Sequence, residues 1–416
     1  MSHRPGTTEP VLSGPARVED ALVIQLGPTD GMRDHDGPRS GMALVRAYVA
    51  THEGARLTPV PRAPRRREPR RGGGDVMRGW VTTPDSPPTA LHLKLASARD
   101  AAALRAELSA SRGVVNVYHP PVQYPVDAPP TAPSATGGTC DQWGLERCGF
   151  PFVWEELDGD DGPAIALIDQ GWDTGHPEVA GRIEQAAVRR GGPESPSVHA
   201  TAVASVICAR RDDRTGISGC CSAKVRLYNV WAPGSFDPLA YYEALADVAT
   251  SGLRVLNLSL ASSLEDPLVK DGIRRCIDNG VVVVAAMGNC GGQGAWYPAT
   301  YDGVVAVGAT NRADERASFS SYGPQICLSA PGEYIYTAGV PGDLPRSCGT
   351  SYAVPMVSAA VWMVLRQHPG WTVLQVKDFL ARCTTGGGWS PELGWGRLDM
   401  LKLRDELNGL AGATAA

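Results

Sequence analysis

Short, continuous apolar runs dominate the chain after residue 140, and amphipathic segments separate them. Runs that are apolar on both faces are typical of parallel strands covered by helices on each side. The expected strands are 164–168, 225–230, 255–258, 281–284 and 304–307. Helical periodicity covers 238–250 and 266–279, and Thr372 to Gln375 has the spacing of a capping box that opens a later helix. The pattern predicts a doubly wound, mostly parallel α/β domain over 140–410, with ligands at the carboxyl ends of its strands.

The preceding region, 19–127, has the pattern of a smaller domain. It contains two successive strand–helix–strand units. The expected strands are 21–26, 55–60, 91–95 and 114–118, and the expected helices are 42–52 and 100–110. Two such units predict a small α+β sandwich.

Four further segments lack such periodicity. Residues 1–18 are rich in Pro, Gly and Ser and are expected to be disordered, and 411–416 form a short tail. The Arg- and Pro-rich stretch 62–88 is interpreted as a solvated loop, with a processing site or a site for an anionic partner as the alternative. Residues 128–139 have linker composition, and the prolines from Tyr124 onward disfavour helix and strand and favour an extended, accessible backbone.

Composition narrows the function classes. A chain of 416 residues with 43% hydrophobic and 20% charged residues is expected to fold into two or three domains. A net charge of −5 does not suggest a nucleic-acid partner, and no apolar run is long enough to span a membrane. The polar amino terminus lacks the pattern of a secretory signal, so a cytoplasmic location with reduced thiols is expected, with secretion by a non-standard route as the alternative.

Three polar residues stand where apolar runs end or helices begin. Asp169 follows the run 164–168, His199 opens a helix-like stretch, and Ser351 precedes a long apolar segment. A serine hydroxyl becomes a nucleophile when a histidine takes its proton and a carboxylate orients the histidine ring. The order Asp, His, Ser on an α/β sheet therefore predicts a catalytic triad.

The sequence around these residues resembles the subtilases, the subtilisin-like serine proteases of peptidase family S8. The matching segments are Ile168–Gly171 with His176–Glu178, His199–Ala204, Ala285–Asn289, Gly349–Pro355 and, for the usual start of the mature enzyme, Gln142–Leu145. The histidine motif is degraded, because Ala200 and Ala202 replace a glycine and a second histidine. The resemblance covers about 140–400 and implies the subtilisin fold.

The resemblance implies roles for four residues. Ser351 would attack the scissile carbonyl, and His199 would take its proton and return it to the leaving amine. Asp169 would orient His199 and stabilise its charged form. The side-chain amide of Asn289 and the backbone N–H of Ser351 would hold the oxyanion. The implied activity is that of a serine endopeptidase acting on a peptide or protein through an acyl-enzyme, with no cofactor required.

The resemblance also places a substrate-binding strand and one wall of a pocket. Family substrates pair as an extended strand with the segment that corresponds to Ser259, Leu260 and Ala261. Ala261 stands where the family usually has glycine. Met287 and Gly288 belong to the oxyanion segment, and Met287 replaces a usually small residue.

Trp296 stands at a position that, in subtilases, lies at the base of the pocket for the residue before the scissile bond. An indole there should fill the pocket, which predicts a preference for Gly, Ala or Ser before the cut. The alternative is that Trp296 rotates outward and packs on the surface. A narrowed cleft favours a restricted substrate, such as one precursor peptide, over bulk protein.

The region 19–127 resembles the propeptide of the family by pattern alone. This implies a zymogen whose own N-terminal domain is an intramolecular inhibitor, with autocleavage expected within Tyr124 to Cys140. Glu178 and Asp213 fall where family members often bind calcium, which makes calcium the candidate ion.

Two rival functions remain open at the level of sequence. An inactive subtilase-like protein could capture peptides, as the changes at Ala200 and Ala202 suggest, although the retained triad and Asn289 oppose this. An acyl-transfer ligase or macrocyclase would need a shielded intermediate. No inserted cap is obvious between Asp169 and Ser351, so this alternative ranks last.

Overall fold

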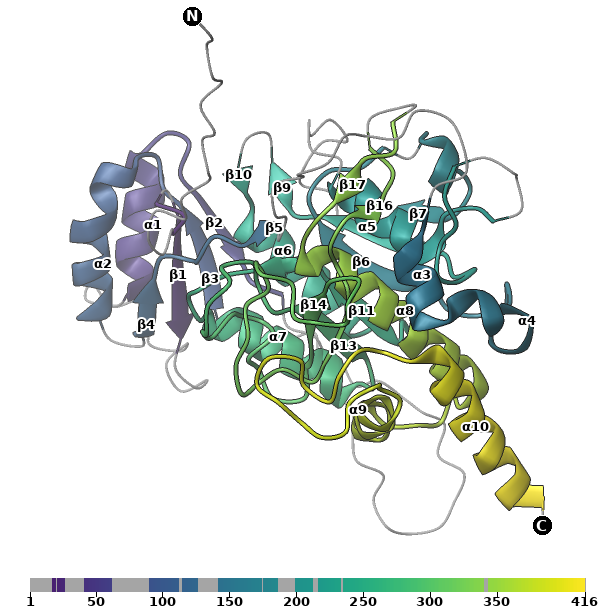
Figure 1. Ribbon diagram of the computed structural model, residues 1–416. Coiled ribbons are helices and arrows are strands. Elements are labelled where there is room, and N and C mark those ends of the chain that lie inside the picture. The colour runs from purple at the N-terminus through teal and green to yellow at the C-terminus, as the bar shows by residue number, and fades with distance from the viewer. Residues whose placement is uncertain are drawn as a thin grey trace, which may run out of the picture. The chain divides into compact units, whose positions relative to one another are not determined.

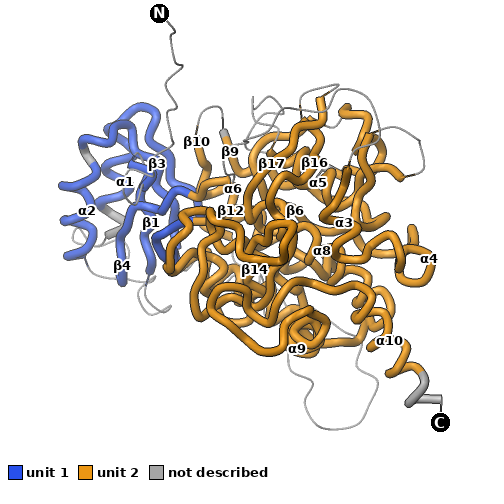
Figure 2. Tube along the Cα trace, in the orientation of Figure 1, with its two compact units in different colours: residues 1–59, 87–122, 262–266 blue, residues 60–86, 123–261, 267–416 orange. Residues whose placement is uncertain are grey.

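The computed structural model describes most of the chain in two compact units (Figure 2). The described residues are 17–19, 21–26, 41–61, 90–111, 114–125, 141–173, 175–185, 199–211, 216–232, 235–339 and 343–415. One unit comprises Met1–Pro59, Pro87–Val122 and Ser262–Asp266, and the other comprises Val60–Ser86, Gln123–Ala261 and Pro267–Ala416.

The first unit is a four-stranded antiparallel sheet with two helices. Its elements are β1 (Ala21–Leu26), α1 (Gly41–Thr51), β2 (Arg56–Pro59), β3 (Ala90–Lys94), α2 (Ala101–Ser109) and β4 (Val114–Tyr118). The strands follow the order β2-β3-β1-β4, and the two helices lie side by side (Figure 1). Leu22 and Ile24 share a hydrophobic core with Val45 of α1 and Leu104 of α2. Both predicted strand–helix–strand patterns are present.

A fully parallel sheet forms the centre of the second unit. The strands are β6 (Ile165–Asp169), β7 (Ile183–Gln185), β8 (Val225–Asn229), β11 (Val255–Leu258), β13 (Val282–Ala286), β14 (Val305–Thr310) and β15 (Leu328–Pro331). Their order is β15-β14-β13-β11-β6-β8-β7. Val282 and Val284 belong to the largest core, and Val283 between them is buried on the opposite face. Burial on both faces confirms the predicted doubly wound α/β class.

Helices cover this sheet, and two of them, α5 (His199–Cys208) and α8 (Thr350–Gln367), begin at or next to residues of the candidate site. The others are α3 (Trp143–Cys148), α4 (Trp154–Leu157), α6 (Pro238–Val248), α7 (Pro267–Asp278), α9 (Val373–Arg382) and α10 (Met400–Ala415). Helix α8 is buried from Thr350 to Leu365 and packs on α5, β11, β13, β14 and β15. The predicted capping box of α9 is present at Thr372 and Gln375. Among the described helices, none has the length and hydropathy to cross a membrane.

Short antiparallel pairs complete the second unit, and one of them corrects an expectation. The pairs are β9 (Trp231–Ala232) with β10 (Ser235–Phe236), β5 (Tyr124–Pro125) with β12 (Leu260–Ala261), and β16 (Ile335–Tyr336) with β17 (Arg346–Ser347). The prolines after residue 124 were expected to disfavour strand, yet Tyr124 and Pro125 pair with β12. Pro125 is compatible with this because a proline can end an edge strand without breaking a ladder.

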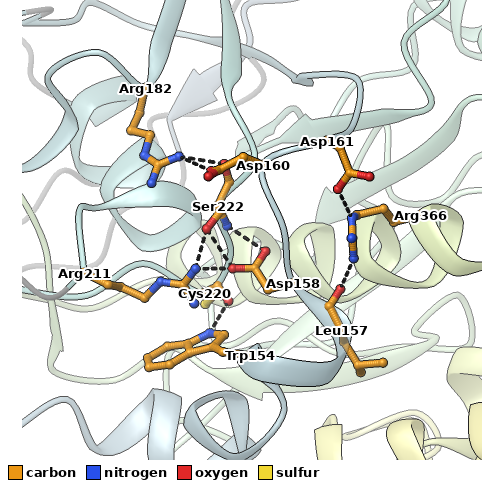
Figure 3. A network of polar contacts seen from close by, with 10 residues as sticks. All are labelled: Trp154, Leu157, Asp158, Asp160, Asp161, Arg182, Arg211, Cys220, Ser222 and Arg366. Atoms are coloured by element: carbon orange, nitrogen blue, oxygen red, sulfur yellow. Dashed lines mark hydrogen bonds and ion pairs between the residues drawn. The ribbon is translucent and has the colours of Figure 1, made fainter.

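Three aspartates in the loop before β6 each bind an arginine from another part of the second unit (Figure 3). The pairs are Asp158 with Arg211, Asp160 with Arg182, and Asp161 with Arg366. These contacts tie the beginning of the sheet to the residue before β7, to the chain that follows α5 and to the C-terminal part of α8. The carboxylates of the loop are therefore occupied by guanidinium groups.

Asp158 is the buried member of this set. Its side chain is 3% exposed, whereas that of Asp161 is 83% exposed. Asp158 also accepts hydrogen bonds from Ser222 N at 2.9 Å and Ser222 Oγ at 2.8 Å. The guanidinium of Arg211 lies over the Trp154 ring, 4.4 Å from its centroid.

Replacing Asp158 with alanine is expected to lower the free energy of unfolding by about 3 kcal/mol, because a largely buried Arg211 loses its counter-charge. Urea denaturation in a Ser351→Ala background, which prevents self-digestion, measures this change. Asp161→Ala is the matched control, since it removes an equally direct but solvated ion pair and should leave the midpoint nearly unchanged. Equal shifts for the two variants would contradict the assignment.

Candidate active site

Three different elements supply the candidate triad. Asp169 is the last residue of β6, His199 is the first residue of α5, and Ser351 lies in the first turn of α8. Their exposed fractions are 1%, 4% and 0%. Asp169 is at the carboxyl end of a parallel strand, which is where ligands bind in sheets of this kind.

Asp169 and His199 are in direct contact. His199 Nδ1 lies 2.5 Å from Asp169 Oδ1, and the same oxygen accepts a hydrogen bond from Gln170 N at 2.6 Å. A carboxylate at Nδ1 holds the proton on that nitrogen and leaves Nε2 as the basic atom of the neutral ring. The pair therefore has the geometry of a general base with its orienting carboxylate.

Ser351 is brought to the same place by the packing of α8 on α5. The ring of the next residue, Tyr352, lies 6.2 Å from the His199 ring between centroids. Ser351 Oγ donates a hydrogen bond to the carbonyl of Ser259 at 3.2 Å. The candidate nucleophile thus lies beside the segment that was predicted to bind substrate.

Asn289 is oriented by the residue before the candidate nucleophile. Its Oδ1 accepts hydrogen bonds from Thr350 N at 3.0 Å and from Thr350 Oγ1 at 2.9 Å. With Oδ1 held in this way, the amide plane is fixed relative to Ser351. Thr350 was not among the residues singled out from the sequence, although its place between Gly349 and Ser351 in the serine motif was the available signal.

Trp296 lies against the oxyanion segment. A Cβ atom added at Gly288 would be 2.9 Å from Cδ2 of the Trp296 ring, closer than van der Waals contact allows, and Gly288 has φ of 94°. Only glycine fits both constraints. Met287 is fully buried, and Leu260 and Ala261 of β12 are buried as well. The indole ring therefore packs against Gly288, the residue directly before Asn289.

The aspartate motif also contains a histidine, His176, whose surroundings differ from those expected of a catalytic base. His176 is 2% exposed, and its Nδ1 accepts a hydrogen bond from Glu178 N at 3.3 Å. Burial lowers the pKa of His176, and the nearby Asp173 only partly opposes this. His176 is therefore neutral at pH 7 and braces the loop that follows Asp169.

The calcium candidates divide between the described and the undescribed parts of the chain. Glu178 is buried, and its Oε2 accepts a hydrogen bond from Ile217 N at 2.9 Å. Asp213 lies outside the described residues. Within the described part of the chain, no three or more His, Cys, Asp or Glu side chains gather in one place. Glu178 therefore braces the loop around Ile217, and calcium binding stays a prediction.

Comparisons with known proteins identify the family of the chain. The profile of the subtilase family, Peptidase_S8, matches residues 160–396. Thermitase of Thermoactinomyces vulgaris is 29% identical over 233 residues, which are 54% of this chain and 82% of thermitase. Subtilisin Savinase of Lederbergia lenta is 32% identical over 255 residues, which are 59% of this chain and 92% of that protein.

One solved structure extends the likeness to the fold. The structure of the prenylagaramide maturation protease PagA has a TM-score of 0.55 and 25% sequence identity. The match covers 62% of this chain and 98% of the PagA chain. With a family profile across more than half of its length, this chain belongs to the subtilase family of serine proteases.

Proposed function

We propose that this chain is a serine endopeptidase that hydrolyses peptide bonds through an acyl-enzyme. The observation that carries the proposal is the 2.5 Å contact between His199 and Asp169 beside a buried Ser351. His199 Nε2 takes the Ser351 hydroxyl proton while Oγ bonds to the substrate carbonyl carbon. The carbonyl electron pair moves to oxygen, where the Asn289 amide and the Ser351 N–H stabilise the charge.

The second half of the reaction returns the enzyme to its starting state. Collapse of the tetrahedral intermediate breaks the C–N bond, and His199 gives its proton to the departing amine. Water then loses a proton to His199 as its oxygen attacks the acyl carbon. The C–Oγ bond breaks, the acid is released, and Ser351 recovers its proton. Atoms and charge balance without any cofactor.

The pairing of β5 with β12 supports the proposal that the chain is made as a zymogen. Antiparallel pairing puts Tyr124 opposite Ala261 and Pro125 opposite Leu260. The chain therefore runs toward Ser259, whose carbonyl accepts the Ser351 hydroxyl. Gln123, just before β5, is 1% exposed. A segment held in this direction beside the nucleophile would block a substrate and would lead into the proposed cut within Tyr124 to Cys140.

A restricted substrate is the finer part of the proposal. The contact of Trp296 with Gly288 supports a pocket that admits only Gly, Ala or Ser before the cut. The structural neighbour PagA is named as a maturation protease. We propose by analogy that this chain cuts a specific precursor peptide.

Intact mass spectrometry of the purified protein beside Ser351→Ala tests the function. We expect the wild-type chain to split within Tyr124 to Cys140 and the variant to stay whole, because the cut needs the Ser351 hydroxyl. A fluorophosphonate, which labels activated serines, should add its mass to the wild-type catalytic fragment alone. Splitting of both chains would indicate a host protease. A whole, unlabelled wild type would instead favour the peptide-binding alternative.

A further inference from the structure

A buried line of hydrogen bonds connects the middle of α8 to the candidate nucleophile. Ser358 Oγ donates to Asn257 Oδ1 at 2.9 Å, and Asn257 Nδ2 donates to Ser259 Oγ at 3.1 Å. Ser259 Oγ in turn donates to the Ser351 carbonyl at 2.9 Å. All four residues are 0% exposed. The donors point in one direction along the line, which ends on Ser351.

Pro355 explains why this line of hydrogen bonds ends at the Ser351 carbonyl. In an α-helix the carbonyl of Ser351 would accept the N–H of the residue four positions later, which is Pro355. Proline has no N–H, so this buried carbonyl lacks its helical donor. A buried carbonyl without a donor is costly. The Ser259 hydroxyl supplies the missing hydrogen bond from outside the helix.

The contact between Ser259 and Ser351 is reciprocal. The Ser259 hydroxyl binds the Ser351 carbonyl, and the Ser259 carbonyl accepts the Ser351 hydroxyl at 3.2 Å. On the other side of Ser351, Thr350 is held by Asn289 through two hydrogen bonds. The backbone on both sides of the nucleophile is thus fixed by side chains from different elements.

We propose that Ser259 is a positioning residue, whose hydroxyl replaces the helical hydrogen bond that Pro355 removes and so sets the orientation of Ser351. Ser358 and Asn257 hold that hydroxyl in its donating direction. This role is separate from the pairing of β12 with an extended chain, which uses backbone groups. The inference rests on the proposed function, because it assumes that Ser351 is the nucleophile.

A double-mutant cycle between Ser259→Ala and Pro355→Ala tests this directly. Ser259→Ala keeps the backbone carbonyl but removes the hydroxyl, and we expect about tenfold slower fluorophosphonate labelling and a similar fall in kcat with KM unchanged. Pro355→Ala alone should change little, since the carbonyl already has a donor. In the double variant, the alanine N–H can donate to the Ser351 carbonyl, so most of the lost rate should return.

Additive effects, or normal labelling of Ser259→Ala, would overturn the inference while leaving the proposed function intact. A wild type that the fluorophosphonate does not label would overturn both. Thermal unfolding of each variant separates positioning from folding, because a purely structural hydroxyl would lower the midpoint without lowering kcat. If Ser259→Ala does not fold, Ser358→Ala removes the far end of the line, and a rate equal to wild type would count against the proposal.

Discussion

Replacement of His199 by alanine is expected to lower kcat about a million-fold, the scale seen when the base is removed from subtilisin. Without the imidazole, the Ser351 hydroxyl keeps its proton and is a poor nucleophile. Asp169 is not expected to substitute, because its Oδ1 is directed at His199 Nδ1 at 2.5 Å. Hydrolysis of an acyl-Ala-Ala-Pro-Ala anilide and the rate of fluorophosphonate labelling measure the loss.

His368→Ala is the matched control, since His368 follows the last residue of α8 and lies away from the triad in sequence. It should keep wild-type kcat, and both variants should unfold at similar temperatures. A His199→Ala variant that retained more than about 1% of wild-type kcat would show that another group acts as the base, because general-base catalysis alone contributes about 10²–10⁴-fold.

Replacement of Trp296 by glycine is expected to reverse the preference before the scissile bond. The wild type should cleave an Ala-terminated acyl anilide faster than a Phe-terminated one, because the indole occupies the space above Gly288. Removing the ring opens an apolar slot, and burying a phenyl group there stabilises the transition state by about 1.5–3 kcal/mol. We expect the ratio of kcat/KM values, Phe over Ala, to rise about 100-fold.

Trp395→Gly controls for the loss of a tryptophan elsewhere, since Trp395 is 43% exposed at the surface. It should leave the Phe-to-Ala ratio unchanged. Faster cleavage after Phe by the wild type would refute the filled pocket, whatever Trp296→Gly does. Such a result would mean that the ring moves off Gly288 when substrate binds.

Much of the fold was predictable because its signals are local. The run Val282–Ala286 is apolar at every position, and this pattern alone indicates a strand that is covered on both faces. The capping box at Thr372 and Gln375 is likewise a matter of spacing along the chain. Asp169, His199 and Ser351 could be named because short motifs surround them, and their catalytic roles stay proposals.

Other features depended on residues that are far apart in sequence. Proline content disfavoured a strand at Tyr124 and Pro125, but β12 provides backbone partners that local propensity does not include. The family resemblance made Glu178 a calcium candidate, and the structure adds that its Oε2 accepts a hydrogen bond from Ile217 N, 39 residues away. A sequence pattern alone does not indicate which hydrogen-bond donor reaches a given carboxylate oxygen.

The sequence by itself determined the fold class, the family motifs and the identity of the candidate triad, because periodicity and short motifs are properties of neighbouring residues. Only the tertiary structure decided how Ser351 is held. Its carbonyl loses a helical donor to Pro355, four residues away, and gains one from Ser259, which is 92 residues away. Hydrogen bonds between distant segments exist only after the sheet and α8 have packed, so no local pattern records them.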